Sequence, residues 1–220
     1  MPRLRVGVLI SGRGSNLQAL IDAAREPDYP AEIVMVISNR GNALGLRRAA
    51  DAGIAAHVVT DPDRAAFAVA ADQILRDADV ELVALAGFMR LLDTHFVEAW
   101  RDRMVNIHPS LLPAFPGLHP QRQALAAGVK FSGCTVHLVR AAVDTGPIIA
   151  QAVVPVLDSD DEDRLADRIL AAEHRLYPLA VRLFAENRLR IEGNRVVFSG
   201  AVAPSAALFN PSEPFASRGG

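Results

Sequence analysis

The sequence predicts an α/β protein with a Rossmann-like, mostly parallel central sheet and helices on both faces. The C-terminal part is expected to add antiparallel strands and a long helix. Two observations predict this class. Up to about residue 110, short apolar runs without a polar face alternate with segments whose apolar residues recur at helical spacing, as in parallel sheets covered by helices. Beyond Gly117, two longer extended runs follow each other closely, which is typical of an antiparallel pair.

The elements of the first part follow in regular order. The expected strands span residues 6–10, 33–37, 56–59, 80–86 and 105–108. The expected helices span residues 15–25, 43–52, 61–78 and 96–101. Gly53 is expected to cap the end of the second helix, and Asp61 to cap the start of the third with Pro62 at its first position.

The second part contains fewer and longer elements. A helix is expected at 121–127, an antiparallel pair at 133–140 and 148–156, and a charged amphipathic helix at 160–186, bent at Pro178. Residues 189–191 and 196–198 flank Glu192-Gly193-Asn194 and predict a hairpin. Residues 201–220 are rich in Ala, Ser, Pro and Gly, and we expect them to be loosely ordered.

Composition narrows the class of protein. The 220 residues include 23 Lys and Arg against 25 Asp and Glu, a net charge of −2, so a nucleic-acid partner is not expected. The single cysteine, Cys134, has no partner in the chain and fits a reducing, cytoplasmic setting. The apolar runs are too short for a membrane span or a signal peptide, so a membrane partner is not expected either.

The segment from Asn106 to Gly117, Asn-Ile-His-Pro-Ser-Leu-Leu-Pro-Ala-Phe-Pro-Gly, is the most informative part of the sequence. Asn106 and His108 stand two positions apart on an expected strand, so their side chains should project from the same face. One is a hydrogen-bond donor that does not ionise, and the other titrates near neutrality. Acyl transfer uses both, since one group stabilises an oxyanion and the other moves a proton.

A second segment, Ser11-Gly12-Arg13-Gly14-Ser15-Asn16, joins the first expected strand to the first helix. Backbone amides at such a helix start suit a phosphate. The Lys-Ser/Thr ending of a P-loop is missing, and Leu17 occupies the place of the third glycine of the dinucleotide fingerprint, which favours a monophosphate. The alternative is a tight turn with Ser15 or Asn16 as a helix cap.

Asp144 follows the strand expected at 133–140. It is either an ordinary turn residue or a carboxylate that the loop returns to the sheet, where it would favour a protonated His108. The sequence has no metal-binding signature, no Gly-x-Ser-x-Gly elbow, and its one cysteine lies in an apolar strand. General acid chemistry with oxyanion stabilisation, and no covalent intermediate or metal, is therefore expected.

Four stretches of the chain resemble the folate-dependent phosphoribosylglycinamide formyltransferases of purine synthesis. They are Val8 to Gln18, Leu85 to Arg90, Asn106 to Gly117, and Thr135 to Gln151 with its Asp144-Thr145-Gly146-Pro147. The likeness covers about residues 4–199. It implies a single formyltransferase domain over residues 1–200, with a nucleotide/phosphate-binding half at 1–100 and a catalytic/folate half at 101–200.

The resemblance also implies an activity. The formyl group of 10-formyltetrahydrofolate, a co-substrate, would pass to the amine of N1-(5-phosphoribosyl)glycinamide in de novo purine (IMP) biosynthesis, by a monomer or a homodimer. Catalysis is expected from Asn106, His108 and Asp144. Ribonucleotide binding is expected from Gly14, Ser15, Asn16 and Glu173. Folate binding is expected from Arg64, Met89, Arg90, Leu91, Leu92, Asn106, Arg140, Ala141, Ala142, Val143 and Asp144.

Some of these positions have a simpler interpretation. Without the resemblance, Glu173 would be an exposed helix charge and Arg90 a solvated loop charge, and His137 is expected only to support the structure. Pro120-Gln121 follows His119 where many relatives carry threonine and histidine.

Two activities from the same superfamily compete. A formyltetrahydrofolate hydrolase would use the same three residues with water as the acceptor, and normally carries a further domain before the first strand. A methionyl-tRNA formyltransferase would carry a C-terminal RNA-binding domain and a basic surface. A non-catalytic nucleotide-binding module on the same fold is the third alternative.

Overall fold

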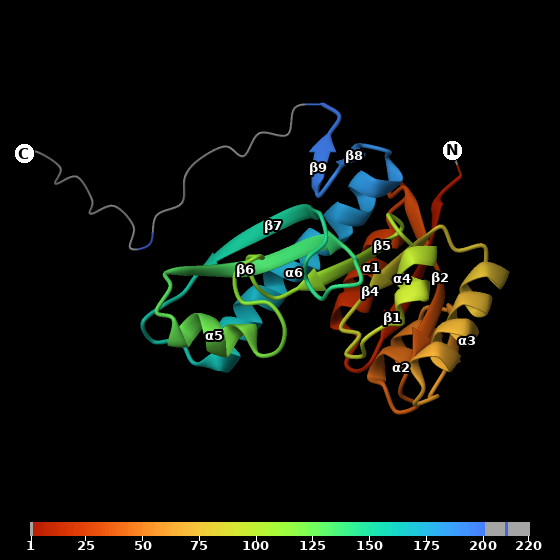
Figure 1. The fold of residues 1–220 in the computed structure, drawn as a ribbon, viewed down its shortest axis with the longest axis horizontal. Helices are drawn as coiled ribbons and strands as arrows, with labels where there is room; N and C mark the ends of the chain where they lie inside the picture. Colours follow the sequence, from red (N-terminus) through yellow and green to blue (C-terminus); the bar gives the residue numbers. More distant parts are fainter. Residues whose placement is uncertain (1, 201–209, 211–220) are drawn as a thin grey trace, which may run out of the picture.

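A computed structural model describes residues 2–200 and Asn210. Its centre is a seven-stranded sheet in the order β3-β2-β1-β4-β5-β6-β7 (Figure 1). The first five strands are parallel and β6 and β7 form an antiparallel pair, as the sequence predicted. The antiparallel pairing of β6 with β5 was not predicted. The strands are β1 (Leu4–Ile10), β2 (Ala31–Ser38), β3 (Ala55–Val58), β4 (Leu82–Leu85), β5 (Met104–His108), β6 (Phe131–Leu138) and β7 (Ile148–Pro155).

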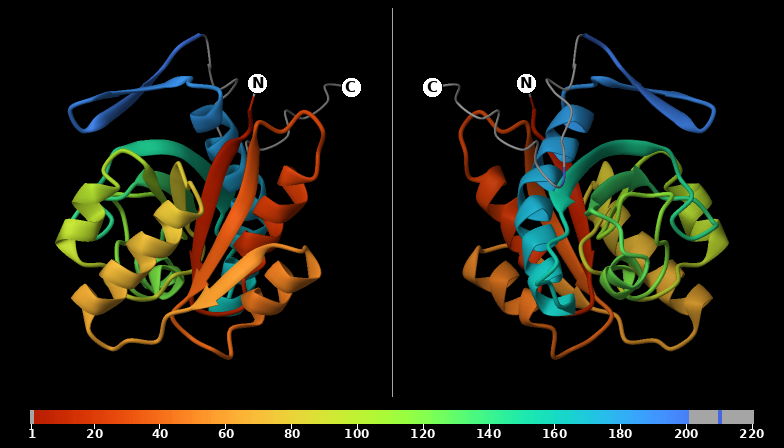
Figure 2. Two further views of the ribbon diagram at one scale, coloured as in Figure 1. Left: turned by 90° about the vertical axis from the view of Figure 1, so that its right-hand side faces the viewer. Right: turned by 90° about the vertical axis from the view of Figure 1, so that its left-hand side faces the viewer.

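Helices cover both faces of this sheet (Figure 2). On one face, α1 (Ser15–Ala24), α2 (Leu44–Asp51), α5 (Pro120–Ala126) and α6 (Glu162–Ala185) bury apolar side chains such as Leu17, Leu20 and Ile169. On the other face, α3 (Arg64–Asp77) and α4 (Thr94–Ala99) bury Phe67, Leu75 and Trp100. This double cover explains why the strands lack a polar face.

Successive strand residues alternate between the two apolar layers. In β1, Val6, Val8 and Ile10 belong to the layer under α1 and α6, whereas Leu9 belongs to the layer under α3. Cys134 in β6 is fully buried in the first layer, as expected of a core cysteine. Burial raises the pKa of its thiol to about 12, so it is not a nucleophile at neutral pH.

One predicted helix start was wrong. Asp63, not Asp61, caps α3 and accepts a hydrogen bond from the Ala66 amide at 2.8 Å. The Asp61 carboxylate instead accepts from the Asp63 amide in the preceding turn, so Pro62 lies outside the helix. The error at α3 arose because Asp61 and Asp63 offer competing caps within one turn. The start of α1 at Ser15 agrees with the prediction, and Gly14 caps it in a left-handed conformation, so the alternative with Ser15 or Asn16 as the cap does not hold.

The other predicted boundaries agree with the structure to within a residue or two. Asp161 caps α6, which is one continuous helix although Pro178 lies inside it. The predicted hairpin is β8 (Leu189–Glu192) and β9 (Arg195–Phe198). The expectation for residues 201–220 lies outside the described residues, Asn210 excepted. Within residues 2–200, no helix is long and apolar enough to cross a membrane.

The strand order reverses between β1 and β4, because the chain continues from β1 toward β2 on one side and from β4 toward β5 on the other. In open α/β sheets, ligands bind outside the carboxyl ends of the strands at such a point. Here the Met89 amide, after β4, donates to the Ser11 hydroxyl, after β1, at 2.8 Å. The loops after β1 and β4 therefore meet beside the end of β5, where Asn106 and His108 lie.

Candidate active site

Asn106 and His108 lie on β5 at alternate positions, and their side chains contact His137 and Asp144, which are themselves neighbours. In the antiparallel pairing of β5 with β6, Asn106 lies opposite His137 and His108 opposite Thr135. The Asn106 amide nitrogen is 3.2 Å from Nε2 of His137, and His108 Nδ1 is 3.5 Å from Asp144 Oδ2. The shared face that the spacing predicted thus forms one polar cluster.

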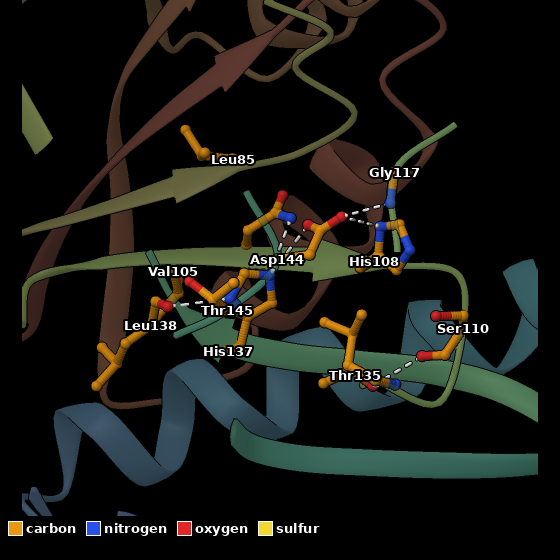
Figure 3. A network of polar contacts seen from close by, with 12 residues as sticks. Leu85, Val105, His108, Ser110, Gly117, Thr135, His137, Leu138, Asp144 and Thr145 are labelled. Carbon is orange, nitrogen blue, oxygen red and sulfur yellow. Dashed lines mark hydrogen bonds and ion pairs between the residues drawn. The ribbon is translucent and has the colours of Figure 1, made fainter. Parts of the chain in front are cut away.

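The Asp144 carboxylate is the centre of this cluster (Figure 3). Besides its contact with His108, its Oδ1 lies 3.7 Å from His137 Nε2, and its Oδ2 accepts a hydrogen bond from the Gly117 amide at 2.8 Å. The side chain is only 7% exposed. Asp144 has a φ of 56°, and this left-handed turn directs its carboxylate back over the sheet. The loop therefore does bring the carboxylate to His108, the step that spacing alone left open.

His137 is neutral in this arrangement. Burial lowers its pKa, more than the nearby Asp144 carboxylate raises it. Its Nδ1 lies 3.0 Å from the Leu138 carbonyl and therefore carries the proton. The lone pair is then on Nε2, which accepts a hydrogen bond from the Asn106 amide. The ring consequently fixes which end of the Asn106 amide faces β6 and leaves one amide hydrogen free.

His108 has a hydrogen-bond acceptor at each ring nitrogen. Nε2 lies 3.0 Å from the Phe115 carbonyl, and Nδ1 faces Asp144. Two acceptors suit an imidazolium, which donates from both nitrogens. Of the two rings beside Asp144, His108 is therefore the one whose contacts suit a cation.

The Pro-rich loop from Pro109 to Gly117 is held in place by side chains of β6 and β7. The Thr135 hydroxyl donates to the Ser110 carbonyl at 2.7 Å and accepts from the Leu112 amide at 3.0 Å. Gln151 donates to the Leu112 carbonyl at 2.9 Å. These bonds position the Phe115 carbonyl and the Gly117 amide, the two backbone groups that touch His108 and Asp144.

The loop between β1 and α1 is closely packed against α2. Gly14 has a φ of 68°, and a Cβ at this position would lie 2.6 Å from the Gly45 Cα. The Gly45 amide donates to the Gly12 carbonyl at 3.1 Å, and the Arg48 guanidinium donates to the Arg13 carbonyl at 3.0 Å. The first amides of α1 have no acceptor within the helix, so they suit an anion.

Asn16 and Glu173 form a buried pair beside this loop. The Asn16 amide donates to Glu173 Oε2 at 2.8 Å, and both residues are less than a tenth exposed. Glu173 is therefore not an exposed helix charge, and burial raises the pKa of its carboxyl. The Asn16 oxygen is buried without a partner among the described residues, so it can accept one further hydrogen bond.

The segment after β4 forms a rim with exposed apolar side chains. Met89 and Leu91 are 67% and 52% exposed, while Leu92 packs against the core. Arg90 is not a solvated loop charge, because its guanidinium stacks on Phe67 and donates to the Asp61 and Pro62 carbonyls. Arg64 is exposed in the first turn of α3, beside the loop that Arg90 holds.

The loop from Arg140 to Asp144 contains one unexpected orientation. Ala141, Ala142 and Val143 are exposed, but the Arg140 side chain is only 14% exposed and pairs with Asp102 at 2.5 Å. The structure therefore brings together Asn106, His108 and Asp144 in one cluster and Asn16 with Glu173 in another, whereas the Arg140 side chain points to a different partner.

Three contributors to the cluster were missed from the sequence: His137, the Phe115 carbonyl and the Gly117 amide. His137 had a detectable signal, because Thr135 and His137 are polar at alternate positions of an otherwise apolar strand. The two backbone groups had none. In the part of the chain that the structure describes, no group of three or more His, Cys, Asp or Glu side chains could hold a metal ion.

Comparison with known proteins adds independent information. The family model for formyl transferase matches residues 4–181. The chain is 42% identical to the phosphoribosylglycinamide formyltransferase of Escherichia coli over 204 residues, which covers 91% of this chain and 96% of that protein. It is 56% identical over 194 residues, 86% of its length, to the trifunctional purine biosynthetic protein adenosine-3 of Drosophila pseudoobscura pseudoobscura. It spans only 14% of that longer protein.

Solved structures agree. Glycinamide ribonucleotide transformylase 1 from Symbiobacterium toebii superposes with a TM-score of 0.87 at 55% identity, over 89% of this chain and 94% of that one. A formyltetrahydrofolate deformylase from Pseudomonas syringae superposes with a TM-score of 0.83 at 28% identity, over 89% of this chain and 66% of that one. The extent of these matches shows that the chain belongs to the formyl transferase family.

Proposed function

We propose that this protein transfers the formyl group of 10-formyltetrahydrofolate to the amine of N1-(5-phosphoribosyl)glycinamide, with the N-formyl ribonucleotide and tetrahydrofolate as products, in de novo purine biosynthesis. One observation carries the proposal: an amide, a histidine and a buried carboxylate converge near the start of α1, whose free backbone amides suit a phosphate. The E. coli and S. toebii relatives carry names that denote this reaction.

Each member of the cluster has a defined task in this reaction. The substrate amine attacks the formyl carbon, and the carbonyl oxygen becomes an alkoxide. Asn106 donates its free amide hydrogen to that oxygen, because its other hydrogen is held by His137. His108, as an imidazolium, supplies the proton that allows the folate nitrogen to leave as the carbon–nitrogen bond breaks, and the proton that the attacking amine loses restores the imidazolium. Asp144 keeps His108 charged and oriented.

The ribonucleotide is proposed to bind at the loop before α1. The amides that follow Gly14 face the phosphate at the positive end of the helix dipole, which suits one phosphate group. Glu173 accepts from a ribose hydroxyl, and Asn16 holds the Glu173 carboxyl in position. These contacts come from Gly14, Ser15 and Asn16 at one end of the chain and from Glu173 on α6.

The folate is proposed to bind against the exposed rims on both sides of the cluster. The segment Met89, Arg90, Leu91 and Leu92 supplies an apolar surface for the pterin. The loop Arg140, Ala141, Ala142, Val143 and Asp144 lies beside it, Asn106 reaches the formyl group, and Arg64 contacts the outer part of the folate. In this proposal residues 1–100 hold most of the nucleotide site and residues 101–200 the catalytic groups, although Glu173 and Met89 cross the division.

The direct experiment supplies 10-formyltetrahydrofolate to the purified protein with and without the ribonucleotide. Formation of N-formyl ribonucleotide and tetrahydrofolate only when both are present supports the transferase. Formate release without the ribonucleotide would instead identify the hydrolase, the activity that the deformylase relative carries by name. If neither mixture showed turnover but the ribonucleotide still bound, the result would support a non-catalytic nucleotide-binding module.

The setting of the reaction belongs to the same proposal. Both partners are small molecules, and neither a nucleic acid nor a membrane takes part. A buried cysteine thiol suits the reducing cytoplasm, where we place the enzyme. It acts as a monomer or a homodimer, and sedimentation velocity at the assay concentration distinguishes the two.

A further inference from the structure

The loop that carries Asp144 starts far from the site it serves. Because β5 and β6 are antiparallel, the end of β6 at Leu138 lies beside the start of β5 at Val105, not beside His108 at its end (Figure 3). The loop must therefore fold back along β5 before the Asp144 carboxylate reaches His108. The position of the carboxylate depends on how firmly the base of this loop is fixed.

Two backbone contacts close the base of the loop. The Val139 amide donates to the Met104 carbonyl at 2.8 Å, and the Leu138 amide donates to the Pro147 carbonyl at 2.9 Å. Gly146 lies directly against this closure, since a Cβ there would be 1.7 Å from the Leu138 oxygen. The backbone thus fixes both ends of the loop but leaves residues 140–145 to be held by side chains.

The Arg140 side chain is the main side-chain anchor at this base. Its Nη2 donates to Asp102 Oδ1 at 2.5 Å, and its Nη1 donates to the Val139 carbonyl at 3.0 Å. Asp102 stands in the tight turn before β5 with a φ of 62°. The pair therefore links the segment that leads into Asn106 and His108 to the segment that leads into Asp144.

The orientation of Arg140 is not that of a ligand-binding arginine. Its side chain is 14% exposed, and the partly buried ion pair directs it toward the turn at Asp102, at the opposite end of β5 from His108. A charge-assisted hydrogen bond to a carboxylate is stronger than one between neutral groups, and partial burial reduces its screening. Releasing the guanidinium toward a ligand would leave Asp102 without this partner.

We propose that Asp102 and Arg140 are positioning residues, a clamp that holds the Asp144 loop against β5, and that the Arg140 side chain does not contact the folate. This inference rests on the proposed function, because Asp144 is assumed to act on His108 during formyl transfer. According to this proposal, the loop contributes only its backbone and the side chains of Ala141 to Val143 to the folate site.

A double-mutant cycle tests the clamp. Asp102→Ala and Arg140→Met are each expected to lower kcat about tenfold, because a small displacement of a catalytic group is costly. The KM for 10-formyltetrahydrofolate should change less than twofold. The double variant should be no slower than either single variant, and Arg140→Lys, which keeps the charge, should recover part of the loss. The matched control is Glu98→Ala, which breaks an exposed ion pair with Arg101 just before the same turn and should leave kcat unchanged.

Two results would overturn the clamp: a raised KM for folate in Arg140→Met with Asp102→Ala unaffected, or losses that multiply in the double variant. Hydrogen–deuterium exchange provides a readout that needs no turnover. Amides of residues 141–146 should exchange faster in both clamp variants and not in Glu98→Ala. If the wild-type protein fails to transfer formyl groups but the exchange result holds, the proposed function fails and the clamp stands as a structural device. Unchanged exchange in both clamp variants refutes the clamp whatever the activity.

Discussion

The Asn106 amide nitrogen donates to Nε2 of His137 across the β5–β6 pair, at 3.2 Å. Only a neutral ring with its proton on Nδ1 can accept this bond, and burial together with the Leu138 carbonyl selects that state. The consequence is a fixed amide orientation, in which Asn106 presents its remaining hydrogen to the site. A residue that looked like structural support in the sequence thereby sets the geometry of the proposed oxyanion donor.

Replacing His137 should therefore slow catalysis, although His137 acts through Asn106 and not by contact with the substrate. His137→Phe removes the acceptor, and we expect a loss of about tenfold in kcat because Asn106 can then rotate. His137→Gln keeps an acceptor at a similar distance and should lose less. His57→Gln, on the exposed strand β3, is the matched control. Steady-state kinetics measure the effect, and a wild-type kcat for His137→Phe would contradict the proposed role.

Removing the proposed catalytic side chains themselves should lower kcat further. Asn106→Ala and His108→Ala are each expected to lower kcat at least a hundredfold, since loss of one oxyanion donor typically costs about 2.7–4 kcal/mol. Asp144→Asn should also lose activity, because it leaves His108 without its carboxylate partner. Circular dichroism and urea unfolding establish that each variant is folded. Near-normal turnover in a folded Asn106→Ala or His108→Ala would refute the assignment.

The contact between Gly14 and Gly45 predicts a steric effect that can be isolated. Gly14 and Gly53 have nearly the same φ, 68° and 70°, but a Cβ meets Gly45 only at Gly14 and nothing within 4 Å at Gly53. Gly53→Ala should cost about 1 kcal/mol from left-handed strain alone. Gly14→Ala should cost more and raise the KM for the ribonucleotide about tenfold, because the loop must move.

Denaturant unfolding and kinetics on these two variants and on Gly12→Ala complete the comparison. Gly12 lies in the same loop with open space around it and no left-handed φ, so its substitution should have little effect on stability. Equal unfolding free energies and equal KM values for Gly14→Ala and Gly53→Ala would show that the close contact has no importance.

Glu173 should make the stability of the protein depend on pH. Burial raises the pKa of its carboxyl from the ordinary value of 4.5, so the folded state retains a proton that the unfolded state releases. This group's stabilising contribution is complete below pH 4.5 and is lost as the pH rises through the higher pKa of the folded state. Glu173→Gln removes this dependence, because a neutral amide can still accept from Asn16.

Urea unfolding from pH 4 to pH 8 measures this effect. The free energy of unfolding of Glu173→Gln, relative to wild type, should increase with pH across the window and then level off. Glu26→Gln, at an exposed position, serves as the control and should show no such trend. If the free energies of unfolding of Glu173→Gln and wild type differed by the same amount at every pH, the Glu173 carboxyl would have the same pKa in the folded and unfolded states.

Local pattern predicted much of the fold. Apolar runs without a polar face predicted buried parallel strands, and the change in spacing after Gly117 predicted β6 and β7. The error at the start of α3 arose where two aspartates compete as caps within one turn, since small differences in free energy decide between them.

The sequence by itself determined that Asn106 and His108 share a face, because strand geometry repeats every two residues. It also determined that Cys134 is core and that a small-residue loop precedes the first helix. Only the tertiary structure decided that Asp144 lies between His108 and His137, that Glu173 is buried against Asn16, and that Arg140 turns toward Asp102. Those contacts join residues far apart in the chain. They depend on strand register and on loop paths, which the packing of the whole molecule selects and no local pattern encodes.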